Sequence, residues 1–408
     1  MKILLVHSFL YFDHGGDSVY TLNLGNLLTL KGHEVAYFGM ENEKNISHKY
    51  SKYEMGFIDY EQLNINKNIN NQIKVFKQSI YSAEARKKMG LLLDDFKPDI
   101  VHLQSIHHHL TTSIIHEINS RDIPIIWSQH NLNTICISSM INGDKICEKC
   151  KPNKYYSPLL TRCKKGSFLG SLVGSVQLYF DHFSNVYDKI DKFVMSSYFH
   201  YNKLLEFNFP ADKIIVFPTF IKIQEEIPNN ETGKHILYFG NIETKKGVET
   251  LIDSMALIKS KVPLLLTGEG HRKEDLEKKV VKMNLKNVKF LGYVELDKLK
   301  KLILTSYFTI IPSICYDNYP NSIIESFSLR RPVIGSLIGG IPELIENNRT
   351  GLLVEPGNAD DLAEKIDFLL ANRKLREEMG RNGRDFIEKN LNPEIHYKRL
   401  FDLYRNFI

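Results

Sequence analysis

Short runs of apolar residues alternate along the chain with longer segments in which apolar residues recur every three or four positions. The short runs predict buried strands, and the longer segments predict amphipathic helices. In the first half, strands are expected at Ile3–His7, Glu34–Phe38, Ile100–Leu103, Ile123–Ser128 and Lys192–Ser196. A second series is expected at His235–Phe239, Pro263–Thr267, Val288–Leu291, Phe308–Ile311 and Pro332–Gly335. Strands that alternate with helices predict parallel sheets covered by helices, which is an α/β fold.

The intervening segments supply the helices of two such domains. The clearest helical patterns lie at Val19–Lys31, Gly247–Lys259, Arg272–Met283 and Ala359–Asn372. A chain of 408 residues is long for one core. Periodicity is lost in the polar segment 219–233, which contains Pro228 and Asn229-Asn230. We therefore expect an N-terminal domain at 1–218, a hinge at 219–233, a C-terminal domain at 234–390 and a returning helix at 391–408.

Composition and charge narrow the class of protein. Hydrophobic residues make up 43% of the chain and charged residues 25%, which is ordinary for a soluble globular protein. The net charge of +5 suits a nucleotide or an anionic membrane surface, and no nucleic-acid-binding signature accompanies it. The start, MKILLVHSFLY, indicates a first buried strand rather than a signal peptide, and the stretch 168–180 is too short and polar to span a bilayer. These features predict a cytoplasmic protein whose membrane contact, if any, is peripheral.

The first turn of the chain excludes one class of α/β protein. A nicotinamide dinucleotide site needs Gly-x-Gly-x-x-Gly after the first strand, and the segment 11–17, YFDHGGD, does not fit that pattern.

The segment 308–347 combines features of a nucleotide-sugar pocket. An apolar strand ends at Pro312, and Asp317 then precedes a short helix that contains Glu325. A second strand ends in Gly339-Gly340, directly before another predicted helix. A carboxylate on a helix can accept hydrogen bonds from a sugar diol, and small residues let backbone amides approach a phosphate.

A lysine follows the first strand of the second domain. The strand ends at Gly240-Asn241, and a loop leads through Lys246-Gly247 into a helix. A lysine at this place can reach a donor diphosphate and stabilise the charge that grows on the leaving group. A solvated lysine in a capped strand-to-helix turn explains the same residues when they are taken alone.

Together and in this order, the motifs resemble the GT4 family of retaining, nucleotide-sugar-dependent glycosyltransferases. That resemblance implies the GT-B fold: two Rossmann-like doubly wound domains that face each other across a cleft, with the last helix crossing back to the N-terminal domain. Asp317 and Glu325 fall at the acidic positions of the family's Glu-x7-Glu motif. By the resemblance, Glu325 holds the ribose hydroxyls, Asp317 and the backbone of Asn318-Tyr319 face the donor sugar, and Gly339-Gly340 line the donor pocket.

The resemblance also assigns residues of the first domain. Gly15-Gly16 match a glycine loop that lies against the diphosphate and the sugar, and His130 approaches the reacting centre. His130, Lys246 and Asp317 are then the expected catalytic residues. A strand-end histidine is otherwise more often structural. The run His107, His108 and His109 lies near the acceptor or forms a solvated loop.

Four positions depart from the family pattern. Asn241 stands where many members have an arginine, and Asp317 is one methylene shorter than the usual glutamate. Thr219 replaces an asparagine at the hinge, and Arg330 replaces a glycine expected at a helix end. The first change leaves Lys246 and helix dipoles with more of the task of holding the diphosphate.

The expected donor is a nucleoside diphosphate sugar, and the expected acceptor is a saccharide or a polyprenyl-linked saccharide of a bacterial capsule, exopolysaccharide or O-antigen. No Asp-x-Asp lies where a catalytic metal would be bound, so no catalytic cofactor is expected. Two alternatives stay open: a GT-B sugar-nucleotide epimerase, and a non-catalytic subunit that binds the nucleotide sugar.

Two further features of the first domain are chemically suggestive. Cys136, Cys147, Cys150 and Cys163 have the spacing C-x10-C-x2-C-x12-C, which suits a structural zinc ion, and buried free thiols are the alternative. A subset of similar transferases has the same run. Downstream, Lys164-Lys165 precede an apolar helical face that starts at Phe168. Such a basic edge can bind a membrane surface, and an ordinary packing helix explains it equally well.

Overall fold

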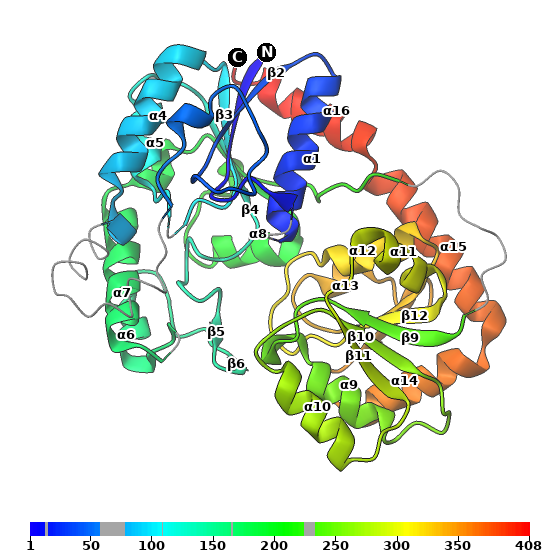
Figure 1. The fold of residues 1–408 in the computed structure, drawn as a ribbon. Helices are drawn as coiled ribbons and strands as arrows, with labels where there is room; N and C mark the ends of the chain where they lie inside the picture. Colours follow the sequence, from blue (N-terminus) through cyan, green and yellow to red (C-terminus); the bar gives the residue numbers. More distant parts are fainter. Residues whose placement is uncertain (13–14, 58–77, 108, 165, 224–232) are drawn as a thin grey trace. The chain divides into compact units, whose positions relative to one another are not determined.

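The computed structural model describes the chain except for residues 13–14, 58–77, 108, 165 and 224–232. His108, Lys165 and most of the expected hinge therefore lie outside the described residues. The chain divides into two compact units (Figure 1). The first comprises Met1–Gly143, Cys147–Thr219 and His396–Ile408, and the second comprises Asp144–Ile146 and Phe220–Ile395.

The first unit contains a six-stranded sheet in which every neighbouring pair is parallel. In spatial order its strands are β2 (Glu34–Phe38), β1 (Lys2–Val6), β3 (Ile100–Leu103), β4 (Ile125–Gln129), β7 (Lys192–Met195) and β8 (Ile214–Val216). Leu4 of β1 lies opposite Ala36 on one side and Val101 on the other. β3 and β4 are buried along their whole length, as their continuous apolar runs predict.

Helices cover both faces of this sheet. The main ones are α1 (Gly16–Leu30), α4 (Ala83–Phe96), α5 (Ser113–Asn119), α6 (Ser157–Thr161), α7 (Phe168–Phe183) and α8 (Tyr198–Leu205). Single-turn helices lie at Ser51–Tyr53, Val186–Lys189 and Ala211–Lys213, and β5 (Ile141–Asn142) and β6 (Lys145–Ile146) form a separate two-stranded hairpin. α4 and α5 lie on one side of the sheet, and α1 lies on the other (Figure 1).

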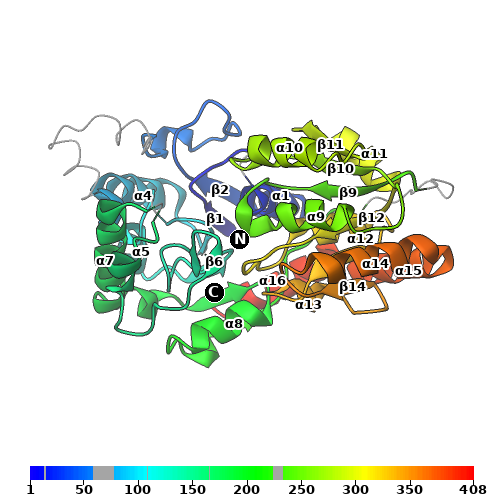
Figure 2. The same cartoon turned by 90° about the horizontal axis from the view of Figure 1, so that it is seen from below.

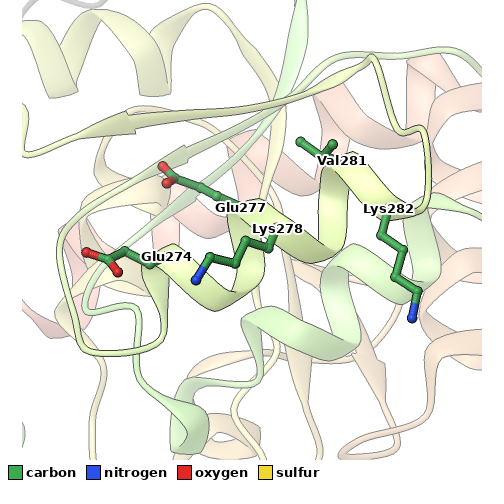
Figure 3. A pocket seen from close by; sticks show the side chains of 5 residues that line it. All are labelled: Glu274, Glu277, Lys278, Val281 and Lys282. Carbon is green, nitrogen blue, oxygen red and sulfur yellow. The ribbon is translucent and has the colours of Figure 1, made fainter.

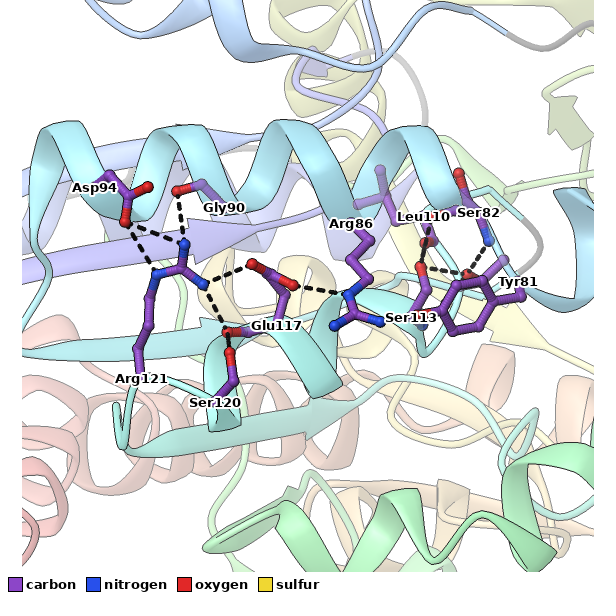
Figure 4. Close-up of polar contacts among 11 residues, drawn as sticks. Tyr81, Ser82, Arg86, Gly90, Asp94, Leu110, Ser113, Glu117, Ser120 and Arg121 are labelled. Carbon is purple, nitrogen blue, oxygen red and sulfur yellow. Dashed lines mark hydrogen bonds and ion pairs between the residues drawn. The ribbon is translucent and has the colours of Figure 1, made fainter.

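An ion-pair network joins α4 to α5. Glu117 of α5 accepts hydrogen bonds from Arg86 Nε at 2.7 Å and from Arg121 Nη1 at 2.6 Å (Figure 4). Arg121 also donates to Asp94 Oδ1 at 3.1 Å. These contacts fix the two helices against each other.

The last helix, α16 (Pro393–Arg405), packs on the first unit and so returns to the N-terminal part of the chain. His396 Nε2 lies 3.0 Å from the Tyr20 hydroxyl of α1, and Tyr404 lies with its hydroxyl 2.6 Å from His102 Nδ1 on β3. Tyr404 and His102 are both buried. The expected crossing of the terminal helix is thereby confirmed.

The second unit repeats the architecture with another six-stranded, all-parallel sheet. Its order is β11 (Val288–Gly292), β10 (Leu264–Thr267), β9 (His235–Phe239), β12 (Ser306–Ile311), β13 (Val333–Ser336) and β14 (Gly351–Val354). Its helices are α9 (Val248–Met255), α10 (Lys273–Lys282), α11 (Leu296–Leu304), α12 (Asn321–Ser328), α13 (Ile341–Leu344), α14 (Ala359–Ala371) and α15 (Arg373–Asn390).

Two apolar clusters lie on opposite faces of this second sheet. One joins α9, α10 and α14 to the strands through side chains such as Leu251, Leu276 and Ile366. The other joins α12, α13 and the end of α15 through Phe327, Leu344 and Ile387. Helices on both faces are also visible when the molecule is viewed from below (Figure 2).

The predicted α/β class with two parallel-sheet domains is confirmed, and all ten expected strands are present. Three details were wrong. The first helix starts at Gly16 rather than Val19, and α9 ends at Met255 rather than Lys259. The sequence pattern also missed β8 and β14, and the two short strands β5 and β6. Among the described residues, no helix combines the length and the apolarity that crossing a bilayer requires.

Candidate active site

Lys246 and Asp317 form an ion pair in the second unit. Lys246 ends a single helical turn, Thr244–Lys246, that links β9 to α9, and Asp317 lies in the loop between β12 and α12. Lys246 Nζ lies 2.6 Å from Asp317 Oδ2, and Ser313 Oγ donates to the same oxygen at 3.1 Å. Burial acts to raise the pKa of Asp317, but Lys246 and Ser313 outweigh it, so the pKa lies below its ordinary value. The carboxylate is therefore charged at neutral pH.

Two glycines let the loops of this site approach closely. Gly339 has a φ of 59°, and a Cβ added to it would lie 2.4 Å from the Asp317 carbonyl oxygen. Gly247 has a φ of 67°, and its Cβ would lie 1.8 Å from the carbonyl oxygen of Pro312. Both positions require glycine on steric and conformational grounds.

The backbone amide of Gly340 is already used within the site. It donates to the Asp317 carbonyl oxygen at 2.8 Å, which ties the entry of α13 to the loop that carries Asp317. α13 itself has only four residues. The Gly340 amide is therefore engaged within the protein, and α13 is too short for its N-terminus to carry an argument of its own.

Glu325 lies on α12 and is half-buried. Burial raises the pKa of its carboxyl group to about 7. Within the described part of the chain, this carboxyl group has no hydrogen-bond or ion-pair partner. A half-buried acid whose pKa is raised and which has no partner among the described residues is costly for folding, which makes it a candidate ligand-binding group.

The remaining predicted donor residues line the same loops. Gly240 and Asn241 follow β9 and are exposed, and the Asn241 carbonyl oxygen accepts a hydrogen bond from the Tyr238 hydroxyl at 2.6 Å. Asn318 and Tyr319 follow Asp317 and are half-buried, with Tyr319 packed against the apolar cluster that contains Phe327. The structure thus brings Lys246, Asp317 and Gly339-Gly340 into contact, and it places Gly240-Asn241 and Asn318-Tyr319 on the same two loops.

In the first unit, Gly15 and Gly16 begin α1. Gly15 is the N-cap residue with a φ of 154°. Asp17, which follows Gly16, has its Oδ2 3.3 Å from His7 Nε2. Its side chain also accepts a hydrogen bond from the Ser105 hydroxyl. Burial acts to raise the pKa of Asp17, but the hydrogen bond and charge of His7 outweigh it and hold the pKa well below its ordinary value.

His130 follows β4 and lies beside this cluster. Its Nε2 is 2.7 Å from Gln104 Oε1, and its ring centroid is 5.4 Å from that of Tyr20. The Gln104 carbonyl oxygen in turn accepts a hydrogen bond from Trp127 Nε1 at 2.8 Å. Burial lowers the pKa of His130 to about 4, so the imidazole is neutral at pH 7. With Gln104 Oε1 as acceptor, the proton of the neutral ring is assigned to Nε2.

Sequence reasoning missed His7, Asp17, Gln104 and Ser105. Their signal was present, because His7 follows β1 and Gln104-Ser105 follow β3 directly. The carboxyl ends of neighbouring parallel strands meet at one edge of a sheet, where ligand-binding groups gather.

Of the three histidines at 107–109, His107 and His109 each contact an aromatic side chain. His107 stacks on Trp127 with ring centroids 5.2 Å apart, and burial lowers its pKa to about 3. His109 meets Phe9 edge to face at 5.1 Å. His108 lies outside the described residues. These contacts favour a packing role for His107.

All five cysteines are free thiols. The Cys136 and Cys150 side chains are hydrogen-bonded to each other, and Met140 N donates to Cys136 Sγ at 3.2 Å. The bond from Cys150 lowers the pKa of Cys136 to about 7, whereas the same contact and burial raise the pKa of Cys150. Among the described residues, no group of three His, Cys, Asp or Glu side chains is arranged to hold a metal ion. The predicted zinc site therefore stays a prediction.

A surface hollow lies elsewhere on the second unit. It is lined by side chains of α10 alone: Glu274, Glu277, Lys278, Val281 and Lys282 (Figure 3). It contains none of the predicted site residues, and its charges are mixed. It is not a candidate active site.

Comparison with known protein families gives two adjoining matches. The model described as "Glycosyltransferase Family 4" matches residues 14–225, and the model described as "Glycosyl transferases group 1" matches residues 219–386. Among curated relatives, a glycosyltransferase of Methanocaldococcus jannaschii is 32% identical over 197 residues, which is 44% of this chain and 55% of that protein. The capsular polysaccharide biosynthesis glycosyltransferase CapM of Staphylococcus aureus is 27% identical over 53% of this chain and 59% of CapM. The matched region thus spans little more than half the length of these relatives.

Solved structures share the fold over the whole chain. Sucrose-phosphate synthase from Thermosynechococcus elongatus has a TM-score of 0.73 at 19% identity and covers 99% of this chain, with 98% of its own chain matched. Anabaena HepE, in complex with UDP-glucose, has a TM-score of 0.63 at 14% identity, with all of both chains covered. Such low identities establish the fold alone, and the fold is GT-B. The first family model matches more than half of the chain, and on that basis the chain belongs to the glycosyltransferases.

Proposed function

We propose that this protein is a retaining glycosyltransferase of the GT4 type. It moves a sugar from a nucleoside diphosphate to a saccharide or lipid-linked saccharide acceptor in the synthesis of a bacterial surface polysaccharide. The observation that carries the proposal is the Lys246–Asp317 contact of 2.6 Å beside the glycine loop at Gly339. HepE binds UDP-glucose and CapM acts in capsule synthesis, which supports the donor class and the setting.

The donor diphosphate replaces Asp317 as a partner of Lys246. Lys246 and Asp317 are partly exposed, with 27% and 19% of their side-chain surfaces accessible, so a ligand can reach them. When the diphosphate binds, the ammonium group stabilises the negative charge that grows as the bond between the sugar and the phosphate breaks. The Asp317 carboxylate is then available to accept hydrogen bonds from sugar hydroxyls.

Glu325 accepts hydrogen bonds from the ribose hydroxyls. Its carboxyl group has a raised pKa and no partner in the described chain, so a ribose diol supplies the donors that it lacks. Binding of the nucleotide then favours the ionised form of Glu325.

In the transfer step, the acceptor hydroxyl forms the new bond to the anomeric carbon on the face that the diphosphate leaves. Its proton passes to the departing phosphate oxygen, so no protein nucleophile is needed. Gly15-Gly16 and the neutral His130 serve this reaction, as the family resemblance indicates. The support for His130 is its position after β4 and the fixed orientation that Gln104 gives it. The charge of Lys246 takes the place of a catalytic metal, so we expect EDTA to leave turnover unchanged.

The test is incubation with labelled nucleotide sugars, with and without extracted lipid-linked saccharide. Transfer that requires the acceptor supports the proposal. Free or epimerised sugar formed without acceptor indicates the epimerase alternative, and binding without turnover indicates the non-catalytic subunit.

Lys246→Ala tests the site, with its neighbour as the matched control. We expect transfer to fall by at least about tenfold, or roughly 1.4 kcal/mol of transition-state stabilisation. Lys245 pairs with Glu243 at 2.8 Å, and Lys245→Ala should keep near-normal activity. Equal losses in both variants would contradict the assignment of Lys246.

A further inference from the structure

Polar side chains interrupt the apolar core of the first unit. Parallel strands that are covered by helices on both faces are normally apolar along their length. His102, however, lies within β3 with none of its surface exposed, and its Nε2 is 2.8 Å from the hydroxyl of Ser128 on β4. Their other hydrogen-bond partners are Tyr404 of α16 and Tyr20 of α1, so this polar layer lies between the sheet and two helices (Figure 1). A buried polar layer is costly unless each member has its partners.

The direction of the hydrogen bonds in this layer follows from one backbone carbonyl group. His396 of α16 has its Nδ1 3.1 Å from the Pro218 carbonyl oxygen, which can only accept, so Nδ1 carries the proton. Burial lowers the pKa of His396 to about 3, so the ring is neutral and its Nε2 accepts. The partner of Nε2 is the Tyr20 hydroxyl at 3.0 Å, which therefore donates. Because a hydroxyl has one proton, Ser128 donates in the hydrogen bond between Ser128 and Tyr20.

The same reasoning orients the remaining hydrogen bonds. The proton of Ser128 is already used, so Ser128 Oγ accepts from His102 Nε2. Burial lowers the pKa of His102 to about 3, which leaves its Nδ1 without a proton. Nδ1 therefore accepts from the Tyr404 hydroxyl at 2.6 Å. Hydrogen bonds thus run in one direction from Tyr404 to the Pro218 carbonyl oxygen. We call the side chains of this sequence of bonds the polar series: Tyr404, His102, Ser128, Tyr20 and His396.

The polar series lies beside an expected catalytic residue. The Tyr20 ring meets the His130 ring edge to face, with ring centroids 5.4 Å apart and planes at 61°. Tyr20 also meets the His396 ring edge to face at 5.6 Å, so its own position is fixed from α16. Gln104 holds one ring nitrogen of His130, and Tyr20 packs against the ring itself. An imidazole that is held both at a nitrogen and on its ring has a defined orientation.

Packing alone does not require the polar groups of Tyr20 and His396. Both side chains are buried. When both partners of a buried hydrogen bond are replaced by apolar groups of similar shape, stability is often nearly unchanged or increased. Hydroxyl and imidazole groups at these positions therefore need a reason besides stability, and a fixed orientation of the neighbouring ring supplies one.

We propose that Tyr20 and His396 are positioning residues for His130, and that the terminal helix α16 thereby takes part in sugar transfer. The inference rests on the proposed function, in which His130 serves the transfer step. Tyr20 acts on the His130 ring directly, and His396 acts through the orientation of the Tyr20 hydroxyl. The series ends on the Pro218 carbonyl oxygen, so it also holds the backbone next to Thr219, where the expected hinge begins.

Transfer kinetics of the full chain test the proposal. We expect Tyr20→Leu, which removes the ring, to lower kcat by about tenfold or more, because small misplacements of a reacting group are costly. Tyr20→Phe and His396→Leu keep the ring at position 20 and break the polar series, so each should lower kcat by about three- to tenfold. KM for the nucleotide sugar should be unchanged in all three variants, because Lys246 and Glu325 lie in the second unit.

Tyr397→Phe is the matched control. Tyr397 also belongs to α16, and its hydroxyl lies 3.0 Å from Nε2 of His33, which follows α1. The substitution therefore removes another hydrogen bond between a tyrosine and a histidine of these two segments, outside the polar series. It should leave kcat unchanged. Unfolding temperatures and UDP binding, measured for each variant, separate lost positioning from lost folding.

A cycle of variants tests whether the effect passes through His130. In a His130→Ala background, Tyr20→Phe and His396→Leu should cause no further loss of kcat. Losses that multiply with that of His130→Ala would overturn the inference. Unchanged kcat in both Tyr20→Phe and Tyr20→Leu would overturn it as well, and so would an equal loss in the Tyr397→Phe control.

A measurement without turnover separates this inference from the proposed function. The ring nitrogens of His130 can be followed by NMR in protein that contains isotope-labelled histidine. Tyr20→Phe and His396→Leu should shift the His130 signals, and Tyr397→Phe should leave them in place. Such shifts in a protein that transfers no sugar would support the positioning of His130 and overturn the proposed function. Unshifted signals would overturn the positioning.

Discussion

The two units share one architecture and differ in how they hold their candidate site residues. In the second unit, a charged pair is held by close backbone contact, since Gly339 and Gly247 leave no room for a Cβ. In the first unit, the neutral His130 is held by a side-chain hydrogen bond to Gln104. The two sheets therefore hold their candidate site residues by different means, through close backbone contact in the second unit and through a side-chain hydrogen bond in the first.

The largest expected effect comes from breaking the backbone contact. Gly339→Ala places a Cβ against the Asp317 backbone at a positive φ, so we expect a loss of about 2–4 kcal/mol in unfolding free energy and no measurable transfer. Gly357→Ala is the control, because Gly357 has a φ of 76° but its nearest neighbour would be 3.9 Å away. Chemical denaturation and the transfer assay measure both effects. Similar losses in both variants would show that φ alone, and not the contact with Asp317, is responsible.

The predicted structural zinc site would lie in the first unit only, so it tests a further difference between the two units. If Cys136, Cys147, Cys150 and Cys163 bind zinc, purified protein contains about one zinc per chain, and a strong chelator lowers the unfolding temperature by several degrees. Cys315→Ser, outside the set, should keep the metal. Folded protein without zinc, as judged by elemental analysis and circular dichroism, would contradict the prediction.

The pH dependence of nucleotide binding tests Glu325. Its folded-state pKa of about 7 exceeds the ordinary value, so the ionised form that accepts ribose hydrogen bonds becomes dominant only as the pH rises through 7. The UDP affinity of the unaltered protein, divided by that of Glu325→Gln, should rise several-fold between about pH 6 and 8. Taking the ratio cancels the effect of the titration of UDP itself. Calorimetry measures the two affinities. A constant ratio would contradict the role of Glu325.

The same carboxyl group affects stability without ligand. Because its pKa is raised in the folded state, its stabilising contribution is present below the unfolded pKa and is lost as the pH rises through 7. Glu325→Gln should therefore unfold at a higher temperature than the unaltered protein at pH 8, and at a similar temperature near pH 5. The opposite order at pH 8 would show that the carboxylate has a partner that stabilises its charge.

The smallest effect concerns Arg330. This residue has a φ of 56° just after α12, at the position where the sequence led us to expect glycine. Arg330→Gly should raise the unfolding free energy by about 0.5 kcal/mol, because the left-handed conformation costs a residue with a Cβ more than glycine loses in entropy. Asn348→Gly, at a φ of 64°, should gain less, because asparagine tolerates that region.

The sequence predicted the fold well because buried parallel strands appear as continuous apolar runs. β8 and β14 were missed because the first is a three-residue strand and the second starts with glycine. The pairing of Lys246 with Asp317, which are 71 residues apart, could not be read from the chain, since it depends on β9 and β12 being neighbours. The hydrogen bond from the Gly340 amide to the Asp317 carbonyl oxygen could likewise not be predicted from the sequence, because it depends on loop geometry.

The central claim is that the second unit binds the donor nucleotide through Lys246 and Glu325. A crystal structure with UDP or GDP tests it most directly. We predict the diphosphate within hydrogen-bond distance of Lys246 Nζ and both ribose hydroxyls on the Glu325 carboxylate. A nucleotide bound away from these two side chains would contradict the account.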